Sequence, residues 1–247
     1  MCIDCAGESN ASSCASLLHS LQPPLSRRGP DYSKHMNIPL NSVKNHLRLC
    51  ACTLRMRGPP LVEDALAQPL TYAHGRAFLW NGEIFGGLEV EAGSCDTDVL
   101  FAALSDCRSD NDILSTLKSV KGPYAFLYFD PETESLWFGR DFFGRRSLLW
   151  CIFIDNEDKT RVILSSVGET DGACDDVRPD DIEVAWQEVP AKGIFKMNLR
   201  SLLAFAVFDK LLVFLLRICF VGFPRPVLIF PLSNLSSSAL LSVTVTT

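Results

Sequence analysis

The residue most able to do chemistry is Cys2, which directly follows Met1. Cysteine is small enough for the initiator methionine to be removed, and Cys2 would then carry a free α-amine beside its thiol. With unperturbed pKa values of about 7.7–8.0 for the amine and about 8.5 for the thiol, the amine can accept the thiol proton. One residue would then supply both nucleophile and base. The alternative is a cysteine that merely happens to follow methionine.

The cysteine content bears on metal binding and on compartment. Two close pairs, Cys2/Cys5 and Cys50/Cys52, raise the question of zinc. However, no histidine is spaced as a ligand and no second Cys-x-x-Cys pattern exists. We therefore expect no metal. The chain opens without a basic region and an apolar run, so we expect the cysteines to be the reduced thiols of a cytoplasmic protein.

Helices that could position this chemistry are predicted at three places. A short helix is expected at Leu17–Leu21, ended by Pro23–Pro24. Asp96 or Thr97 is expected to cap a second helix, and the stretch around Ile113 predicts a third.

Strands dominate the rest of the pattern. Alternating and apolar runs predict strands at 47–56, 77–85, 124–130, 135–140, 148–154, 161–166 and 193–197. The turn Asp130-Pro131-Glu132-Thr133 predicts a hairpin between two of them. Helices early in the chain and many strands, without a regular alternation of strand and helix, favour an α+β sheet protein.

Composition divides the chain near residue 200. The 247 residues are 47% hydrophobic with a net charge of -6, which favours a folded protein. The only charged residues beyond residue 200 are Asp209, Lys210, Arg217 and Arg225. The acidic remainder lacks a basic stripe, so we expect no nucleic-acid partner. The apolar tail 201–247 offers no uninterrupted run of about 20 residues, so membrane spanning is the less favoured reading.

Several motifs accompany Cys2 along the chain. They are Met1-Cys2, Arg28-Gly29-Pro30-Asp31, Arg57 followed by Gln68-Pro69-Leu70, Asn81-Gly82-Glu83-Ile84-Phe85, Asp96-Thr97-Asp98 and 139–148. In type and order they resemble the class II glutamine amidotransferase domain, an N-terminal-nucleophile fold, and specifically the glutaminase half of asparagine synthetases. The resemblance implies a four-layer αββα sandwich over residues 1–200.

The same resemblance implies a set of roles. Cys2 would attack the side-chain amide of L-glutamine and release ammonia. Asn81 and the backbone N–H of Gly82 would form the oxyanion hole. Substrate binding would fall to Arg57, which would hold the α-carboxylate, and to Asp96 with Glu83, which would hold the α-ammonium and fix the substrate.

Each residue also has a simpler interpretation. Arg57 could be a surface strand residue, with Arg55 a rival for its role. Asn81-Gly82 is also a turn signal, and Asp96 could be a helix N-cap.

A second set of simpler interpretations concerns the Asp141 turn and the aromatic residues. Asp141, with Arg140 or Arg145, is expected to lock a turn rather than to touch substrate. Phe78, Trp80 and Phe85 are read as sheet core.

Two departures from the family pattern shape the expected function. The family start is Met-Cys-Gly-Ile, whereas Cys2 here is followed by Ile3-Asp4. The Ser-Gly-Gly-x-Asp-Ser loop of the synthetase domain does not occur, so ATP and magnesium would belong to a separate synthetase domain or protein and no cofactor is expected in this chain. We expect glutamine hydrolysis that serves asparagine biosynthesis. A catalytically impaired glutamine-binding or protein-interaction module is the alternative.

Overall fold

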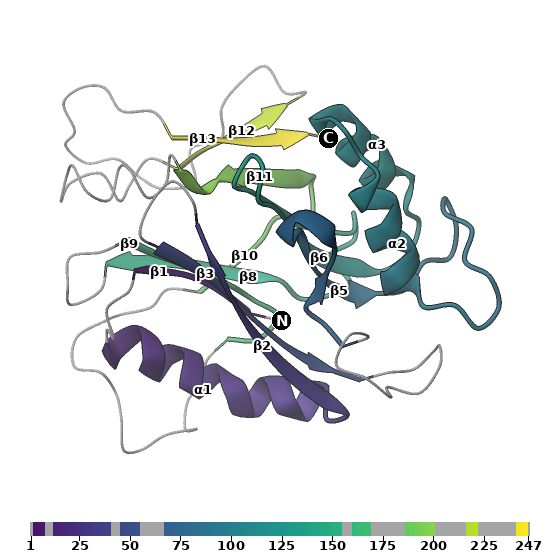
Figure 1. The fold of residues 1–247 in the computed structure, drawn as a ribbon. Coiled ribbons are helices and arrows are strands. Elements are labelled where there is room, and N and C mark those ends of the chain that lie inside the picture. The colour runs from purple at the N-terminus through teal and green to yellow at the C-terminus, as the bar shows by residue number, and fades with distance from the viewer. Residues whose placement is uncertain are drawn as a thin grey trace.

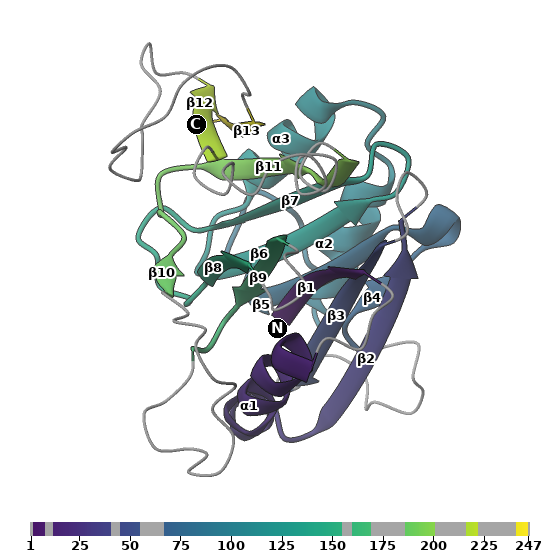
Figure 2. The same ribbon diagram turned by 90° about the vertical axis from the view of Figure 1, so that its left-hand side faces the viewer.

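Two β-sheets pack face to face with helices on both outer sides, as Figure 1 and Figure 2 show. The computed structural model describes residues 2–7, 12–40, 45–54, 67–154, 160–168, 186–200, 216–221 and 241–246. Helix α1 covers the first sheet, and helices α2 and α3 cover the second. This α+β arrangement confirms the predicted four-layer αββα sandwich.

The first sheet is antiparallel throughout and has the order β10-β8-β9-β1-β3-β2. Its strands are β1 (Cys2–Gly7), β2 (Tyr32–Pro39), β3 (Asn45–Thr53), β8 (Leu149–Ile154), β9 (Thr160–Ser165) and β10 (Gln187–Glu188). The strand that begins at Cys2 therefore lies inside the sheet, bonded to β3 on one side and to β9 on the other.

The second sheet has the order β12-β13-β11-β7-β6-β5-β4. Its strands are β4 (Leu70–Thr71), β5 (Ala77–Gly82), β6 (Tyr124–Asp130), β7 (Ser135–Arg140), β11 (Ile194–Asn198), β12 (Leu216–Val221) and β13 (Leu241–Thr246). Among the strands that the structure describes, only β12 and β13 pair in parallel. The predicted hairpin joins β6 to β7, and Asp130 accepts hydrogen bonds there from the Glu132 N–H and the Thr133 hydroxyl.

In the described part of the chain, three hydrophobic clusters fill the spaces between the four layers. Because side chains alternate along a strand, Leu79 of β5 faces the first sheet while its neighbours Phe78 and Trp80 face the helices. The cluster between the sheets is the largest and draws on both inner faces. A smaller cluster joins α1 to the outer face of the first sheet.

Helix α1 (Ser12–Arg28) continues through Pro23 and Pro24, so the predicted helix end was wrong. Proline inside a helix costs roughly 3 kcal/mol. Leu21 and Leu25 lie one turn apart, are 0% and 3% exposed, and pack against the first sheet. Burying leucines contributes about 1.5–3 kcal/mol each, which offsets at least part of the cost of the two prolines.

Helices α2 (Asp96–Ser105) and α3 (Asp110–Ser119) form the layer over the second sheet. In a capping box at the start of α3, the Ser109 hydroxyl accepts from the Asp112 N–H and the Asp112 carboxylate accepts from the Ser109 N–H. The short 3₁₀ turn Ala73–Gly75 precedes β5. The two helices predicted after α1, namely α2 and α3, therefore exist near the expected positions.

The segment after residue 200, predicted to be an atypical tail, contributes β12 and β13. Strand β13 pairs with β11 and so extends the edge of the second sheet. Within the part of the chain that the structure describes, no helix is long and apolar enough to cross a membrane. The division of the chain at residue 200 stays a prediction.

Candidate functional site

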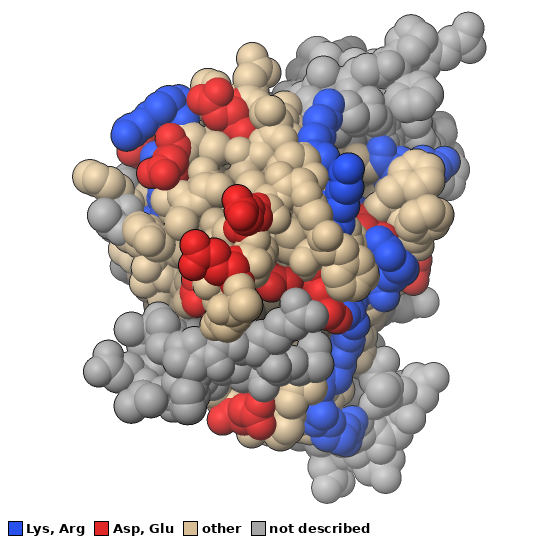
Figure 3. All heavy atoms as spheres, turned by 90° about the vertical axis from the view of Figure 1, so that its right-hand side faces the viewer, with Lys and Arg blue, Asp and Glu red and all other residues tan. Residues whose placement is uncertain are grey.

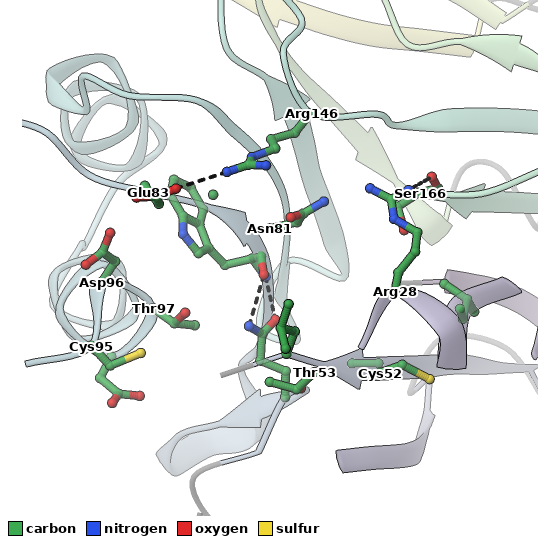
Figure 4. Close-up of a pocket in the computed structure, with 17 residues that line it drawn as sticks. Arg28, Cys52, Thr53, Asn81, Glu83, Cys95, Asp96, Thr97, Arg146 and Ser166 are labelled. Atoms are coloured by element: carbon green, nitrogen blue, oxygen red, sulfur yellow. Dashed lines mark hydrogen bonds and ion pairs between the residues drawn. The ribbon is translucent and has the colours of Figure 1, made fainter. Parts of the chain in front are cut away.

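A cavity of about 330 Å³ opens where the end of β5 meets the first sheet and the start of α2 (Figure 4). Its polar and charged lining includes Arg28, Cys52, Thr53, Gln68, Asn81, Glu83, Cys95, Asp96, Thr97, Asp98, Arg146 and Ser166. Figure 4 shows Asn81 between the Glu83–Arg146 pair and Arg28. Three predicted site residues with side chains, Asn81, Glu83 and Asp96, are thus gathered at one cavity, together with Gly82.

The end of β5 presents a backbone donor to this cavity. In an antiparallel ladder, successive residues direct their N–H groups to opposite sides. The Glu83 N–H donates to Pro123 O at 2.9 Å, so odd-numbered residues face β6. The Trp80 N–H faces the other way and donates to Gln68 Oε1 at 2.7 Å. The Gly82 N–H shares the direction of Trp80 and therefore points away from β6, along the edge that lines the cavity.

Glycine at position 82 is required by packing. A Cβ there would lie 2.6 Å from Pro123 O and 2.7 Å from Tyr124 Cβ, and neither group can move without disturbing β6. The side chain of Asn81 belongs to the face of β5 that carries Leu79, and so it turns toward the first sheet. The Asn81-Gly82 pair is therefore not a two-residue turn but the end of a strand.

Glu83 is held by an ion pair. Arg146 Nη2 lies 3.2 Å from Glu83 Oε1, and the Arg146 and Glu83 side chains are 32% and 25% exposed. Arg146 was given no role in the sequence prediction, although it lies in the 139–148 motif. The pair places one cation and one anion side by side on the cavity wall.

Asp96 is the first residue of α2 and is 6% exposed. The N-cap is Cys95, so the prediction that Asp96 or Thr97 caps this helix was wrong by one position. The Asp96 Oδ2 accepts a hydrogen bond from the Ile84 N–H at 2.6 Å. Asp96 thereby ties the loop after Glu83 to the helix, where the helix dipole favours an anion.

Arg28 brings a second cation to the cavity. Its Nη1 donates to Ser166 O at 2.6 Å and to Ser147 Oγ at 2.9 Å, so it joins the end of α1 to the end of β9. A Cβ at Gly29 would lie 2.2 Å from Cys52 O, so only glycine lets the chain pass this close to β3. The Arg28-Gly29-Pro30-Asp31 motif was the sequence signal for this contact.

The backbone register places Cys2 beside the cavity. Its Cα pairs with Cys50 on β3 and with Ser165 on β9. Because β1 is antiparallel to both, the residues that follow these partners, Ala51 and Ser166, continue past the start of β1, and both line the cavity. The strand therefore begins at the cavity. Arg57, the predicted carboxylate ligand, lies outside the described residues, as does its rival Arg55.

Cys50 is a poor competitor for Cys2. Burial raises the pKa of the Cys50 thiol to about 11, and the neighbouring Cys52 adds to the rise. Cys50 and Cys52 instead make weak contacts with Gln22, and Cys50 also approaches the ring of His35. In the described ranges, no group of three or more His, Cys, Asp or Glu side chains is arranged to hold a metal ion.

Asp141 locks the turn after β7, which confirms the prediction for this residue. Its carboxylate accepts from the N–H groups of Tyr124, Phe143 and Arg145 and from Arg145 Nε. Burial alone would raise the pKa of Asp141, but the Arg145 guanidinium and the three N–H donors together lower it. Phe142 and Phe143 project from this turn and are 79% and 76% exposed. Phe85, which was expected in the sheet core, is 67% exposed.

Solved structures share this fold. The glutamine phosphoribosylpyrophosphate amidotransferase of B. subtilis complexed with ADP and GMP aligns with a TM-score of 0.50 and 17% identity, over 80% of this chain and 47% of that one. A structure described as the allosteric regulatory enzyme of purine biosynthesis aligns with a TM-score of 0.52 and 16% identity over the same shares. At these identities the likeness concerns the fold alone, a four-layer αββα sandwich.

Several proteins are similar to this chain in sequence as well as in fold. This chain is 46% identical over 179 residues to asparagine synthetase domain-containing protein 1 of Bos taurus, across 72% of this chain and 25% of that protein. It is 44% identical over 179 residues to the Homo sapiens protein, with the same shares, and 38% identical over 201 residues to the Gallus gallus protein, across 81% and 29%. The chain thus spans about a quarter of the length of these relatives.

A family model also matches most of the chain. The model of the glutamine amidotransferase domain matches residues 1–172, which include Cys2 and every described residue of the cavity. The chain belongs to the glutamine amidotransferase domain family.

Proposed function

We propose that this chain hydrolyses L-glutamine to L-glutamate and ammonia, with Cys2 as the nucleophile. The observation that carries the proposal is the meeting of two strand ends. Strand β1 begins at the cavity into which the end of β5 directs the Asn81 side chain and the Gly82 N–H. A nucleophile and two oxyanion donors are the minimum set for acyl transfer.

The reaction proceeds in two balanced steps. The Cys2 thiolate adds to the side-chain carbonyl carbon of glutamine after its proton passes to the α-amine of the same residue. The Asn81 amide and the Gly82 N–H stabilise the tetrahedral oxyanion. Its collapse breaks the C–N bond, and the amine returns the proton to the leaving ammonia. Water then adds to the thioester, which releases glutamate and restores the thiol.

Glutamine is a zwitterion, and the cavity offers both charges. Asp96 and Glu83 supply carboxylates for the α-ammonium, and Arg57 remains the proposed partner of the α-carboxylate. Within the described part of the lining, Arg28 and Arg146 also bring positive charge. The proposed hydrolysis uses no metal or cofactor.

The test compares the products of three proteins. Purified wild-type chain, Cys2→Ala and the control Cys107→Ala are incubated with glutamine, and glutamate and ammonia are measured separately. Cys107 contacts Ala103 and Thr116 in the helical layer, away from the cavity, so its removal leaves turnover unchanged. We expect equimolar products from wild type and control, and none from Cys2→Ala. Equal release by Cys2→Ala would refute the mechanism, and an intact mass that retains Met1 would remove the proposed base.

A second candidate is glutamine binding without turnover. It is favoured by Ile3, a β-branched residue where the family has glycine next to the nucleophile. Calorimetry distinguishes the candidates, because a binding module gives a saturable glutamine isotherm and no glutamate. No binding at all would leave only a protein-interaction role.

The wider setting is also a proposal. The names of the relatives support a link to asparagine biosynthesis, in which a separate synthetase domain that uses ATP and magnesium would consume the ammonia. The thiols of Cys50, Cys52, Cys95 and Cys107, none of which forms a disulfide, support a cytoplasmic location. Asparagine formation on mixing this chain with such a domain, glutamine, aspartate and ATP would test the link.

A further inference from the structure

The side chain of Gln68 completes the edge of β5 beside the proposed oxyanion hole. Its Oε1 accepts a hydrogen bond from the Trp80 N–H at 2.7 Å, and its Nε2 donates to Trp80 O at 2.9 Å. One side-chain amide thus satisfies both main-chain groups of Trp80, which is the exchange that two facing residues make in an antiparallel ladder. Gln68 therefore acts on β5 as a neighbouring strand residue would.

The register of β4 explains why this contact falls at Trp80. Leu70 pairs with Phe78, and an antiparallel ladder repeats its hydrogen-bonded pairs every two residues. Counting two places back from Leu70 along one strand and two places on along the other brings Gln68 opposite Trp80. Among the described strands, however, the main-chain pairing of β4 with β5 covers only Leu70–Thr71. A side chain therefore carries the ladder one step beyond the strand.

The consequence lies at Gly82, the next residue whose N–H points to this edge of β5. If the main chain of β4 had continued in register, its carbonyl groups would have reached the Gly82 N–H. Because the ladder ends on the Gln68 side chain, the edge beside Gly82 forms a wall of the cavity instead, and Gln68, Trp80 and Gly82 all line that cavity. The same amide thus ends the sheet and keeps a backbone donor directed at the cavity.

Hydrogen bonds on both edges of β5 fix the segment that carries the proposed oxyanion donors. Gln68 bonds Trp80 on the cavity side, and Pro123 O accepts from the Glu83 N–H at 2.9 Å on the β6 side. Trp80 is also 5% exposed, so its side chain is held by packing. The two residues between Trp80 and Glu83 are those proposed to bind the oxyanion. Their placement matters, because a displacement of about 1 Å can cost about 10²-fold in rate.

We propose that Gln68 is a positioning residue for glutamine hydrolysis, which holds the Asn81 amide and the Gly82 N–H, through Trp80, where the oxyanion forms. This role rests on the proposed function. Each amide atom of Gln68 already bonds the main chain, which favours an indirect role over contact with the substrate. Gln68 should therefore matter more in the transition state, where charge develops on the oxygen, than in the binding of glutamine.

The test separates catalysis from binding with two variants. Gln68→Met keeps a side chain of similar length and removes both hydrogen bonds. Gln68→Glu keeps the acceptor for the Trp80 N–H but replaces the donor with an oxygen. For both variants we expect kcat for glutamine to fall about tenfold or more and KM to change less than about twofold. The inhibition constant of the product glutamate, which has no tetrahedral oxyanion, should stay at the wild-type value.

The matched control for Gln68→Glu is Asn111→Asp, which makes the same change from amide to carboxylate on an exposed residue of α3. Figure 3 displays the side of the molecule on which α3 lies, and acidic side chains are already exposed there. The control should keep the wild-type kcat and melting temperature. The melting temperature of each Gln68 variant is measured as well, and if Gln68→Met does not fold, Gln68→Glu decides.

Three outcomes would overturn the role of Gln68. Wild-type kcat in either variant would show that the two hydrogen bonds do not position the oxyanion donors. A rise in KM and in the glutamate inhibition constant as large as the fall in kcat would assign Gln68 to the shape of the cavity instead. A wild-type chain that releases no glutamate would refute the proposed function and this role with it. The wild-type assay therefore distinguishes a failure of the proposed function from a failure of the Gln68 role alone.

Discussion

Replacing Asp141 by asparagine tests whether one buried carboxylate holds the turn beside the cavity. The Asp141 side chain is 3% exposed and accepts four hydrogen bonds. The Asp141 Oδ2 accepts hydrogen bonds from Tyr124 N–H at 3.2 Å and from Arg145 N–H at 3.0 Å. The Asp141 Oδ1 accepts from Phe143 N–H at 3.1 Å and from Arg145 Nε at 2.9 Å. An asparagine side chain has only one acceptor oxygen, and its NH2 group would face two N–H donors. Two of the four hydrogen bonds are therefore lost.

The expected loss in the free energy of unfolding follows from the two lost hydrogen bonds and the lost charge. Hydrogen bonds to charged groups are worth about 1.5–3 kcal/mol each. Because Arg145 is 44% exposed, its contribution is taken at the low end. We therefore expect Asp141→Asn to lower the free energy of unfolding by about 3 kcal/mol. For a chain of this size the melting temperature would fall by roughly 6–12 °C.

The pH dependence of the stability difference distinguishes the effect of the Asp141 charge from that of packing. The pKa of Asp141 is lowered in the folded protein, so the unfolded chain binds its proton first as the pH falls. The stabilisation is complete above the unfolded pKa of about 3.9 and is lost as the pH falls through the folded value. The difference between wild type and Asp141→Asn should be constant from neutral pH to about pH 5 and shrink below about pH 4.

Urea unfolding at several pH values measures this difference. Asp106→Asn is the matched control, because Asp106 is exposed at the end of α2 and its substitution should stay within about 0.5 kcal/mol of wild type. The reasoning is refuted if Asp141→Asn also stays within 0.5 kcal/mol or so of wild type at pH 7. It is equally refuted if the difference grows as the pH falls.

Three further changes address the strand end, a helix cap and the ion pair. Gly82→Ala places a Cβ 2.6 Å from Pro123 O, so both the melting temperature and glutamine turnover should fall; wild-type turnover in this variant would contradict the assigned packing. Ser109→Ala removes the capping box and should cost about 1 kcal/mol in urea unfolding without changing turnover. Arg146→Ala releases Glu83 from its ion pair and should raise KM for glutamine more than it lowers kcat, with partial recovery in Arg146→Lys; an unchanged KM in steady-state kinetics would argue against this role.

The sequence predicted best the elements whose signals are local. Strands β6 and β7 occupy the expected residues because an Asx turn at Asp130 joins two apolar runs. Strand β2 was missed because it is an edge strand, alternately half-buried and exposed, with few apolar residues to reveal its period. The prediction ended helix α1 too early because the prolines are a local signal to stop a helix. The packing of Leu21 and Leu25 against the first sheet, which keeps the helix going, cannot be seen in the local sequence.

The predicted site stays a prediction, but the structure shows which of its residues lie together. Asn81, Gly82, Glu83 and Asp96 line one cavity, which spacing along the chain alone does not reveal. That Glu83 is paired with Arg146, 63 residues away, depends on how the loop after β7 folds back on the end of β5. Arg57 stays a prediction, since it lies outside the described residues.

The internal position of β1 constrains how this protein can be handled and made. Residues added before Cys2 would continue antiparallel to β3, past Ala51 and toward Leu54, and both of these line the cavity. A leader or an affinity tag at this end would thus be directed into the space proposed for glutamine, instead of into open solvent. Amino-terminal processing would then act as a maturation step that both exposes the amine and empties the site, and purification tags belong on some other part of the chain.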